Sequence, residues 1–439
     1  MRATIQKLSR KCKRRPYWTV AFVLCSSLPA ATPDTPAQAL FNRVRQKVVA
    51  SVKNAPRYTC VETVQRETFI PSFKQRAACE SLENGSNFVL DTRDRLRLDV
   101  GVVGGREVYS WHGEKQFHDT GLDDLVGYGP IGSGMFSTFL AAIFGIARAH
   151  YLFTGTINQD GYRRGEFKFT MPQKLSDYEV HAGRMHLITG YTGGFSVNWN
   201  SGDLLSLRTV TDQLPRETDL CSIEMRTNYR QVELGGSVFL LPGEVTTTMF
   251  QRDGGQQRTQ TQYEDCRTFS GEATLHFDGT TSSPDPQATL ASQTEDLPRG
   301  LLLRIRLASK IDAKSNWVGD PVQGTLDQPL RREKRVIAPK GARVEGRITR
   351  LLAVDLPVPH LEVGIEWRRV IAGPVTYRMS ARLMRDAGLL IPRQGRIHLL
   401  DFVDRYQQVF SYIGVNGKDA SLDYHFVANW RSVHPAEKN

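Results

Sequence analysis

The chain has 439 residues, of which 40% are hydrophobic and 23% charged. This length favours two domains, and the composition allows well-packed cores. The formal net charge is +11, but residues 1–39 alone contribute +6, from seven basic side chains against Asp34. The remaining +5 is mild for so long a chain, and we therefore expect no nucleic-acid partner.

The N-terminus has the pattern of a secretory signal peptide. Basic residues at 10–15 precede a short apolar run, Tyr17–Leu28, and small residues follow. Ala37-Gln38-Ala39 is the best cleavage motif, which predicts a signal peptide over residues 1–39. The alternatives are a membrane anchor and a lipoprotein modified at Cys25. We expect a periplasmic or outer-membrane associated protein.

The cysteine content agrees with export. Cys12 and Cys25 fall in the signal peptide, and an even set of four remains: Cys60, Cys79, Cys221 and Cys266. We expect two disulfides, Cys60–Cys79 and Cys221–Cys266, because each pair joins strands that are close in sequence. Four buried free thiols are the alternative. No zinc-type spacing of Cys and His occurs, and we expect no metal site and no cofactor.

The first predicted element after the signal is a helix. Thr35-Pro36-Ala37-Gln38 resembles a capping box with proline at the first helical position, and apolar residues recur at helical spacing over Leu40–Val52. Cleavage after Ala39 would remove this cap, although the helix survives either way. From 58 to 269 the pattern changes to an antiparallel meander of about ten strands, in which apolar and polar residues alternate.

One stretch inside the meander, Met135–Ile146, has helical rather than strand periodicity. It is too short to span a bilayer, so we expect it to cover the concave face of a curved sheet. Gly127, Gly129 and Gly132 precede it in a dinucleotide-like pattern without a βαβ context, which favours a flexible hinge. We predict a ligand site lined by Trp111, Phe136, Phe139, Leu140, Ile143, Phe144, Phe195 and Trp199. Ordinary core packing is the alternative for these residues.

Residues 277–298 are rich in Ser, Thr, Gly and Pro and are predicted to be a linker between two domains, 40–276 and 299–434. Strand patterns resume after residue 300 and predict a small β-barrel. Arg331-Arg332-Glu333-Lys334-Arg335 is the strongest charge run. It is typical of a solvated hairpin edge, and contact with an anionic membrane surface is the alternative.

The first half resembles the periplasmic outer-membrane lipoprotein carrier family and related lipid-sensing or lipoprotein-sensing half-barrels. The resemblance rests on the helix at Leu40–Val52 followed by Tyr58-Thr59-Cys60-Val61, and on the segments Asp94–Val100 and Glu107–Trp111. It implies a mainly β fold, a curved antiparallel half-barrel with a covering apolar helix. It also implies that acyl chains bind on the inner face of the half-barrel.

The second half is similar to the C-terminal barrel of conjugation and type IV secretion core proteins. Gly319-Asp320-Pro321-Val322, followed by Val336–Gly346, carries this similarity. It implies a small β-barrel, and an envelope protein partner as one candidate for what this domain contacts. No membrane-piercing insertion is evident, since Arg385–Leu390 is too short.

Catalytic patterns are scarce. His112 and His118 are neighbours in sequence, as are His181 and His186, but no zinc-hydrolase motif includes them, and we expect surface or satisfied histidines. No serine-acylation motif occurs, so we predict no catalytic residue. The predicted function is non-enzymatic binding of a lipid, lipoprotein or other apolar ligand. A structural component of an envelope or secretion assembly is the alternative, and a hydrolase is the second alternative.

Overall fold

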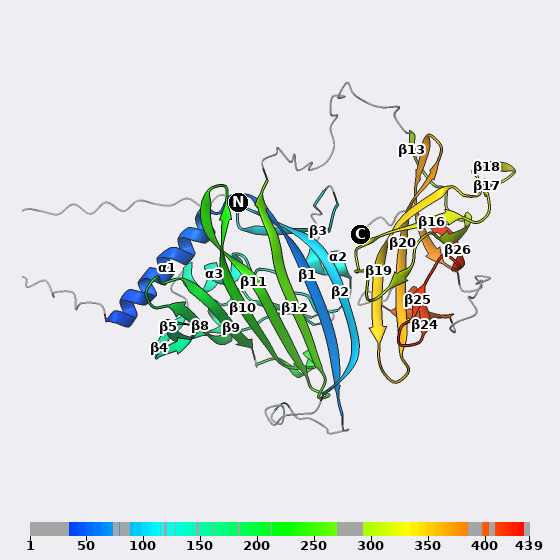
Figure 1. Cartoon of the computed structure of the whole chain (residues 1–439). Helices are drawn as coiled ribbons and strands as arrows, with labels where there is room; N and C mark the ends of the chain where they lie inside the picture. Colours follow the sequence, from blue (N-terminus) through cyan, green and yellow to red (C-terminus); the bar gives the residue numbers. More distant parts are fainter. Residues whose placement is uncertain are drawn as a thin grey trace, which may run out of the picture.

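A computed structural model describes residues 35–72, 79, 88–114, 116–117, 121–127, 129–145, 149–159, 161–182, 185–211, 213–269, 293–384, 397–403 and 409–433 (Figure 1). Residues 1–34 of the predicted signal peptide lie outside this set. None of the helices in the described ranges is long and apolar enough to cross a bilayer.

The first element is helix α1, Pro36–Asn54. The Thr35 hydroxyl accepts a hydrogen bond from the Gln38 amide at 3.2 Å, and proline occupies the first turn, as the sequence predicts. The helix buries one face, made by Leu40, Phe41, Val44 and Val48. The candidate cleavage site at Ala39 therefore lies inside the first turns of a folded helix.

The first domain is an open antiparallel sheet in which the strand order is β3–β2–β1–β12–β11–β10–β9–β8–β5–β4. This confirms the predicted meander. The strands are β1 Tyr58–Pro71, β2 Phe88–Val103, β3 Arg106–Trp111, β4 His150–Gln159, β5 Tyr162–Met171, β8 Tyr191–Asn198, β9 Leu204–Thr211, β10 Leu220–Leu234, β11 Ser237–Gln251 and β12 Gln256–Thr268. A separate hairpin pairs β6, Glu179–Ala182, with β7, Met185–Ile188. Single 3₁₀ turns occur at Gln173–Leu175 and Arg216–Thr218.

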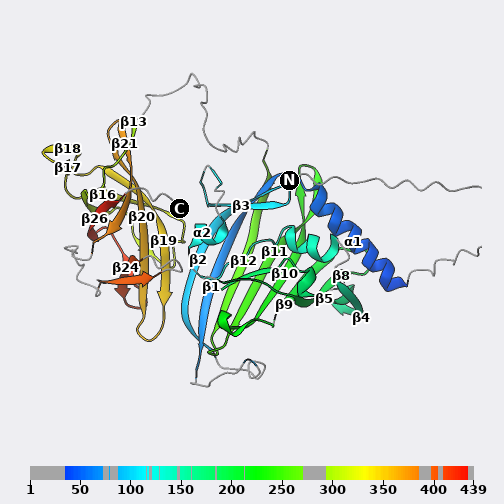
Figure 2. The same ribbon diagram turned by 180° about the vertical axis from the view of Figure 1, so that it is seen from behind.

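The register of the sheet puts apolar residues on one face. Val64 lies opposite Leu96 and Cys60 lies opposite Val100, and all four are buried. The sheet is curved, and α1, α2 and α3 lie on the same side of it, as Figure 2 shows from behind. The predicted half-barrel with helical cover is therefore present.

The covering elements are short. They are α2, Leu122–Val126, then α3, Thr138–Leu140, and a π-helical turn, η2, Ala141–Gly145. The predicted continuous helix over Met135–Ile146 is thus wrong in form, because residues 135–137 form a turn and the helix changes from α to π at Ala141; Ile146 lies outside the described residues. The turn is held against α1, since Arg45 donates to the carbonyls of Phe144 and Gly145, both at 2.9 Å.

The strands of the predicted second domain pair in the order β22–β26–β14–β16–β19–β20–β21. Strand β24 pairs with the beginning of β20 and with β23. The segment that contains β21 and β22 changes partner at Met379, whose amide donates to Arg368. The strands are β13 Gln293–Asp296, β14 Leu302–Leu307, β16 Pro321–Leu326, β19 Arg343–Val354, β20 His360–Ala372, β21 Val375–Arg378, β22 Ser380–Leu383, β23 Ile397–Val403, β24 Val409–Asn416 and β26 Val427–Val433, with the short pairs β15 Ile311–Asp312 and β25 Ser421–Leu422, and β17 Leu330–Arg332 and β18 Arg335–Ala338. The basic run thus forms the exposed β17–β18 hairpin.

The two predicted domains are joined by strand pairing along the free edge of β2, so their strands form one continuous sheet. The end of β19 pairs with Arg93 and Thr92, and the Val318 amide donates to the Arg95 carbonyl at 2.9 Å. The Trp111 ring packs against Gly319, where a Cβ atom would approach it to 2.3 Å. The end of the predicted linker is strand β13, which pairs with β21.

The disulfide pairing differs from the prediction. The bonds join Cys60 to Cys266 and Cys79 to Cys221. Cys60 lies on β1 and Cys266 on β12, which are neighbours in the sheet although 206 residues apart in sequence. Proximity in sequence was therefore the wrong criterion, because the long return strand of the meander closes back on the first.

Candidate functional site

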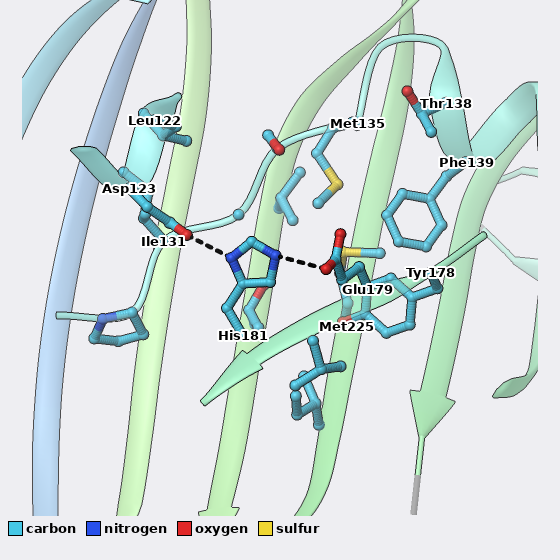
Figure 3. Close-up of a pocket in the computed structure, with 18 of the residues that line it drawn as sticks. Leu122, Asp123, Ile131, Met135, Thr138, Phe139, Tyr178, Glu179, His181 and Met225 are labelled. Carbon is cyan, nitrogen blue, oxygen red and sulfur yellow. Dashed lines mark hydrogen bonds and ion pairs between the residues drawn. The ribbon is translucent and has the colours of Figure 1, made fainter. Parts of the chain in front are cut away.

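A cavity of about 1380 Å³ lies between the sheet and the segment that covers it. We call this the covering segment and define it as the described residues of 121–142. The opposite wall is formed by β10, β11 and β12, and a side wall by β3 and β6 (Figure 3). The site is therefore built by the concave face of the half-barrel and its cover.

Apolar side chains line a large part of the cavity. Met135 and Phe139 project from the covering segment, as Figure 3 shows. The sheet contributes Ile223, Met225, Val245 and Met249. Methionine side chains are flexible and polarizable and adapt to ligands of different shape. This part of the wall suits an apolar group of variable form.

The remaining wall is polar but uncharged along β12. Thr259 and Thr261, with Gln257, line the cavity from this strand. Alternate residues of β11, including Thr247, point the same way, since side chains of a strand alternate between faces. The cavity therefore offers apolar contact and hydroxyl groups together.

The Glu107 side chain on β3 anchors the covering segment. Its carboxylate accepts hydrogen bonds from the amides of Gly134 at 2.6 Å and Phe136 at 3.1 Å, and from the Tyr109 hydroxyl at 2.5 Å. Hydrogen bonds to a charged acceptor are stronger than neutral ones. Gly134 has φ +90°, a conformation that glycine adopts without strain.

A second carboxyl group lies beneath this anchor. Glu62 on β1 is 1% exposed, and one of its oxygens has no hydrogen-bond partner. Burial, with the neighbouring Glu107 charge, raises the pKa of Glu62 to about 8, against a hydrogen bond from Tyr263 that lowers it. The carboxyl group is therefore mostly neutral at pH 7.

The glycine-rich part of the covering segment packs closely on β1. At Gly129, which has φ +75°, a Cβ atom would lie 2.6 Å from an Arg66 nitrogen. The Arg66 guanidinium is itself buried and pairs with Asp94 through two hydrogen bonds, at 2.8 and 2.5 Å. A glycine is thus required at 129 by close approach as well as by backbone conformation.

The structure separates the predicted ligand residues. Phe139 lines the cavity. Phe136 packs between Tyr58 and Tyr263. The remaining predicted residues of this group are buried in the core against α1: Leu140, Ile143, Phe144 and Phe195. Ligand contact by these residues stays a prediction.

The two predicted tryptophans lie elsewhere. Trp111 is at the domain junction, with Arg347 over its ring at 5.7 Å, and Trp199 lies under Arg163 at 4.1 Å. The sheet residues of the cavity were missed. The alternation of Val245, Thr247 and Met249 marks one face of β11 and was the signal that could have identified them.

Two histidines of the β6–β7 hairpin lie together beside the cavity. His181 on β6 lies directly opposite His186 on β7, with ring centroids 4.2 Å apart. The Nδ1 atom of His181 lies 2.8 Å from Asp123 of α2, and Glu179 lies on its other side, as the dashed lines in Figure 3 show. These histidines are exposed and hydrogen-bonded, as expected; His118 lies outside the described residues.

No family model and no curated protein matches the chain. Solved structures with a similar chain trace include a DUF1329 family protein from Desulfovibrio piger (12% identity, TM-score 0.26), which covers 56% of this chain and 98% of its own. A LolA superfamily protein from Nitrosomonas europaea has 8% identity and a TM-score of 0.25. A domain described as an outer membrane lipoprotein-sorting protein from Vibrio parahaemolyticus has 12% identity and a TM-score of 0.28. Each match covers 54% of this chain and 94% of the other chain.

These neighbours include the kind of protein to which the sequence resemblance pointed. The architecture described above follows from the strand order of this chain. The fold and site define a mainly β protein with an open, covered half-barrel. The resemblance of residues 299–430 to secretion-core barrels stays a prediction.

Proposed function

We propose that the first domain binds the acyl part of a lipid or lipoprotein in the cavity beneath the covering segment, without catalysis. The observation that best supports this proposal is the cavity, which has a volume of about 1380 Å³. Sites for drug-sized ligands typically measure roughly 300–1,000 Å³, so this space suits a larger molecule. Its apolar wall, with Phe139, Met225 and Met249, matches hydrocarbon.

The distribution of polar groups favours an amphiphile over a purely apolar ligand. Thr259 and Thr261 are buried and face the cavity, where hydroxyl groups can bond to ester or amide oxygens. Acidic side chains, including Glu107, Asp123 and Glu179, also line the cavity. We therefore expect the ester or amide groups of the ligand near the β12 hydroxyls, and its hydrocarbon against Phe139, Met225 and Met249.

The alternative of a purely structural component predicts a solid first domain. The cavity favours binding over that alternative. The second domain is then the part proposed to contact an envelope protein, and the exposed hairpin Leu330–Ala338 is the part proposed to approach an anionic membrane surface. We place the protein in the bacterial envelope, as its predicted signal peptide and two disulfides suggest.

Non-enzymatic binding is favoured over hydrolysis by the state of a cavity hydroxyl. The Ser137 hydroxyl donates a hydrogen bond to the Gly105 carbonyl at 2.6 Å, so its proton is used to hold the covering segment on β3. A serine nucleophile needs its proton directed at a base instead.

Native mass spectrometry of protein purified from cell envelope, followed by lipid extraction, tests the proposal. We expect a lipid to copurify with the wild type and to be depleted in Thr247→Trp, because the indole projects into the cavity and blocks part of it. Thr248→Trp is the matched control, since its side chain points to the other face of β11. A lipid-free wild type, or equal loss in both variants, would contradict the proposal.

A further inference from the structure

A compact group of potential metal ligands lies at the rim of the cavity. Nitrogen and oxygen atoms of Glu179, His181 and His186 all lie within 4.8 Å of one another. The three residues come from the β6–β7 hairpin, in which the two histidines are directly cross-strand and Glu179 is two residues before His181, on the same face. The two paired strands thus present two imidazoles and a carboxylate to one point.

The separations match those between the ligands of a bound zinc ion. Tetrahedral zinc with bonds of roughly 2.0–2.1 Å keeps its ligand atoms about 3.4 Å apart. The Oε1 atom of Glu179 lies 3.4 Å from Nε2 of His181 and 3.2 Å from Nδ1 of His186. Charge-assisted hydrogen bonds are shorter, at about 2.7–2.9 Å. Both separations are compatible with a cation shared by the three side chains, whose ligand atoms all lie within 4.8 Å of one another.

A fourth residue orients one of the ligands. A carboxylate oxygen of Asp123, Oδ2, lies 2.8 Å from Nδ1 of His181. A hydrogen bond donated by Nδ1 leaves the lone pair of Nε2 directed at Glu179. Metal-binding histidines almost always donate their other ring N–H to a carboxylate or carbonyl in this way. Figure 3 shows the His181 ring held between Asp123 and Glu179.

We propose that Glu179, His181 and His186 bind a divalent transition metal ion of the zinc type, with Asp123 as a positioning residue. Two imidazoles and one carboxylate are a recognised zinc ligand set that leaves a position open for water or another ligand. The side chains of His181 and Glu179 are 37% and 48% exposed, so an ion can reach them. Both residues also line the cavity, so the open position lies at its rim. This assignment does not depend on the proposed apolar ligand.

His112, a histidine outside the proposed site, provides an internal control. His112 has the same contact with a carboxylate, since its Nδ1 lies 2.8 Å from Asp99. Among the described residues, no further group of three potential ligands includes it. A His112→Ala substitution therefore removes a histidine–carboxylate pair without touching the proposed site.

Isothermal titration of tag-free, chelator-treated full chain with zinc chloride tests the assignment. We expect one zinc ion per chain, and a tetrahedral d–d absorption when cobalt replaces zinc. Asp123→Ala should weaken zinc binding by about 10–100-fold, as loss of an orienting partner does. His181→Ala and His186→Ala should weaken it further, and His112→Ala should bind as the wild type does.

The assignment is overturned if zinc does not bind, or if binding survives in the His181→Ala/His186→Ala double variant. Equal losses in His112→Ala and His186→Ala would also overturn it, because they would indicate nonspecific histidine binding. The substituted side chains are exposed, and circular dichroism confirms that the variants are folded. Lipid content measured after chelation separates failure here from failure of the proposed function.

Discussion

Glu62 makes the stability of the first domain depend on pH. The side chain is 1% exposed, and burial raises its pKa from 4.5 to about 8. Glu62→Gln keeps the shape and an acceptor for Tyr263 but cannot ionise. The variant should therefore remove the cost of burying a carboxylate at high pH.

The sign follows from the direction of the shift. Below pH 4.5, Glu62 is protonated in both states and carries no ionisation cost. Between pH 4.5 and 8, the unfolded chain releases this proton while the folded chain keeps it, so the wild type loses stability as pH rises. At 1.36 kcal/mol per pKa unit, the loss approaches about 5 kcal/mol above pH 8.

Urea unfolding of wild type and variant at about pH 5 and about pH 8 measures this difference. We expect Glu62→Gln to gain stability relative to the wild type by several kcal/mol between the two pH values. Glu67→Gln is the control, because its carboxylate is on the same strand but 33% exposed. A stability difference that is constant with pH, or that falls as pH rises, would refute the reasoning.

Three further experiments test contacts in the first domain. The Cys60→Ser/Cys266→Ser variant should unfold about 2–5 kcal/mol more easily, because this bond closes a 206-residue separation; an unchanged melting temperature would argue against the pairing. Glu107→Ala should speed amide hydrogen exchange in the covering segment, because the Glu107 carboxylate accepts hydrogen bonds from two amides of that segment. Unaltered exchange would show that this anchor is dispensable. Arg66→Met should cost about 3–5 kcal/mol in chemical unfolding by leaving the Asp94 charge buried and unpaired, and adding Asp94→Leu should restore much of it; failure of that rescue would locate the loss elsewhere.

The local patterns of the chain predict its elements well. Alternation marks β2 and β11, and the Thr35 cap marks the start of α1, because each depends on residues within a few positions. The covering role of residues 135–145 also follows, since an apolar helical stretch in a β domain must pack on the sheet. The short length of this helix could not be predicted from the sequence, because the change to a π-helical turn at Ala141 depends on contacts with α1.

Features that depend on contacts between distant segments of the chain could not be predicted from the sequence. The Cys60–Cys266 bond requires that β12 return beside β1, and nothing near either cysteine shows this. Trp111 has the composition of a pocket residue, but the second domain covers it at Gly319. The cluster at the cavity also depends on α2, which brings Asp123 to His181 from 58 residues away, so His181 and His186 were predicted only as surface or satisfied histidines.

The most direct test of the account is photo-crosslinking with a fatty acid that carries a diazirine on its acyl chain. After irradiation of the pure protein, peptide mass spectrometry locates the labelled residues. The account predicts adducts on the covering segment around Phe139 and on β10 and β11 around Met225 and Met249. Labelling confined to the second domain, or no labelling that an excess of unmodified fatty acid suppresses, would contradict it.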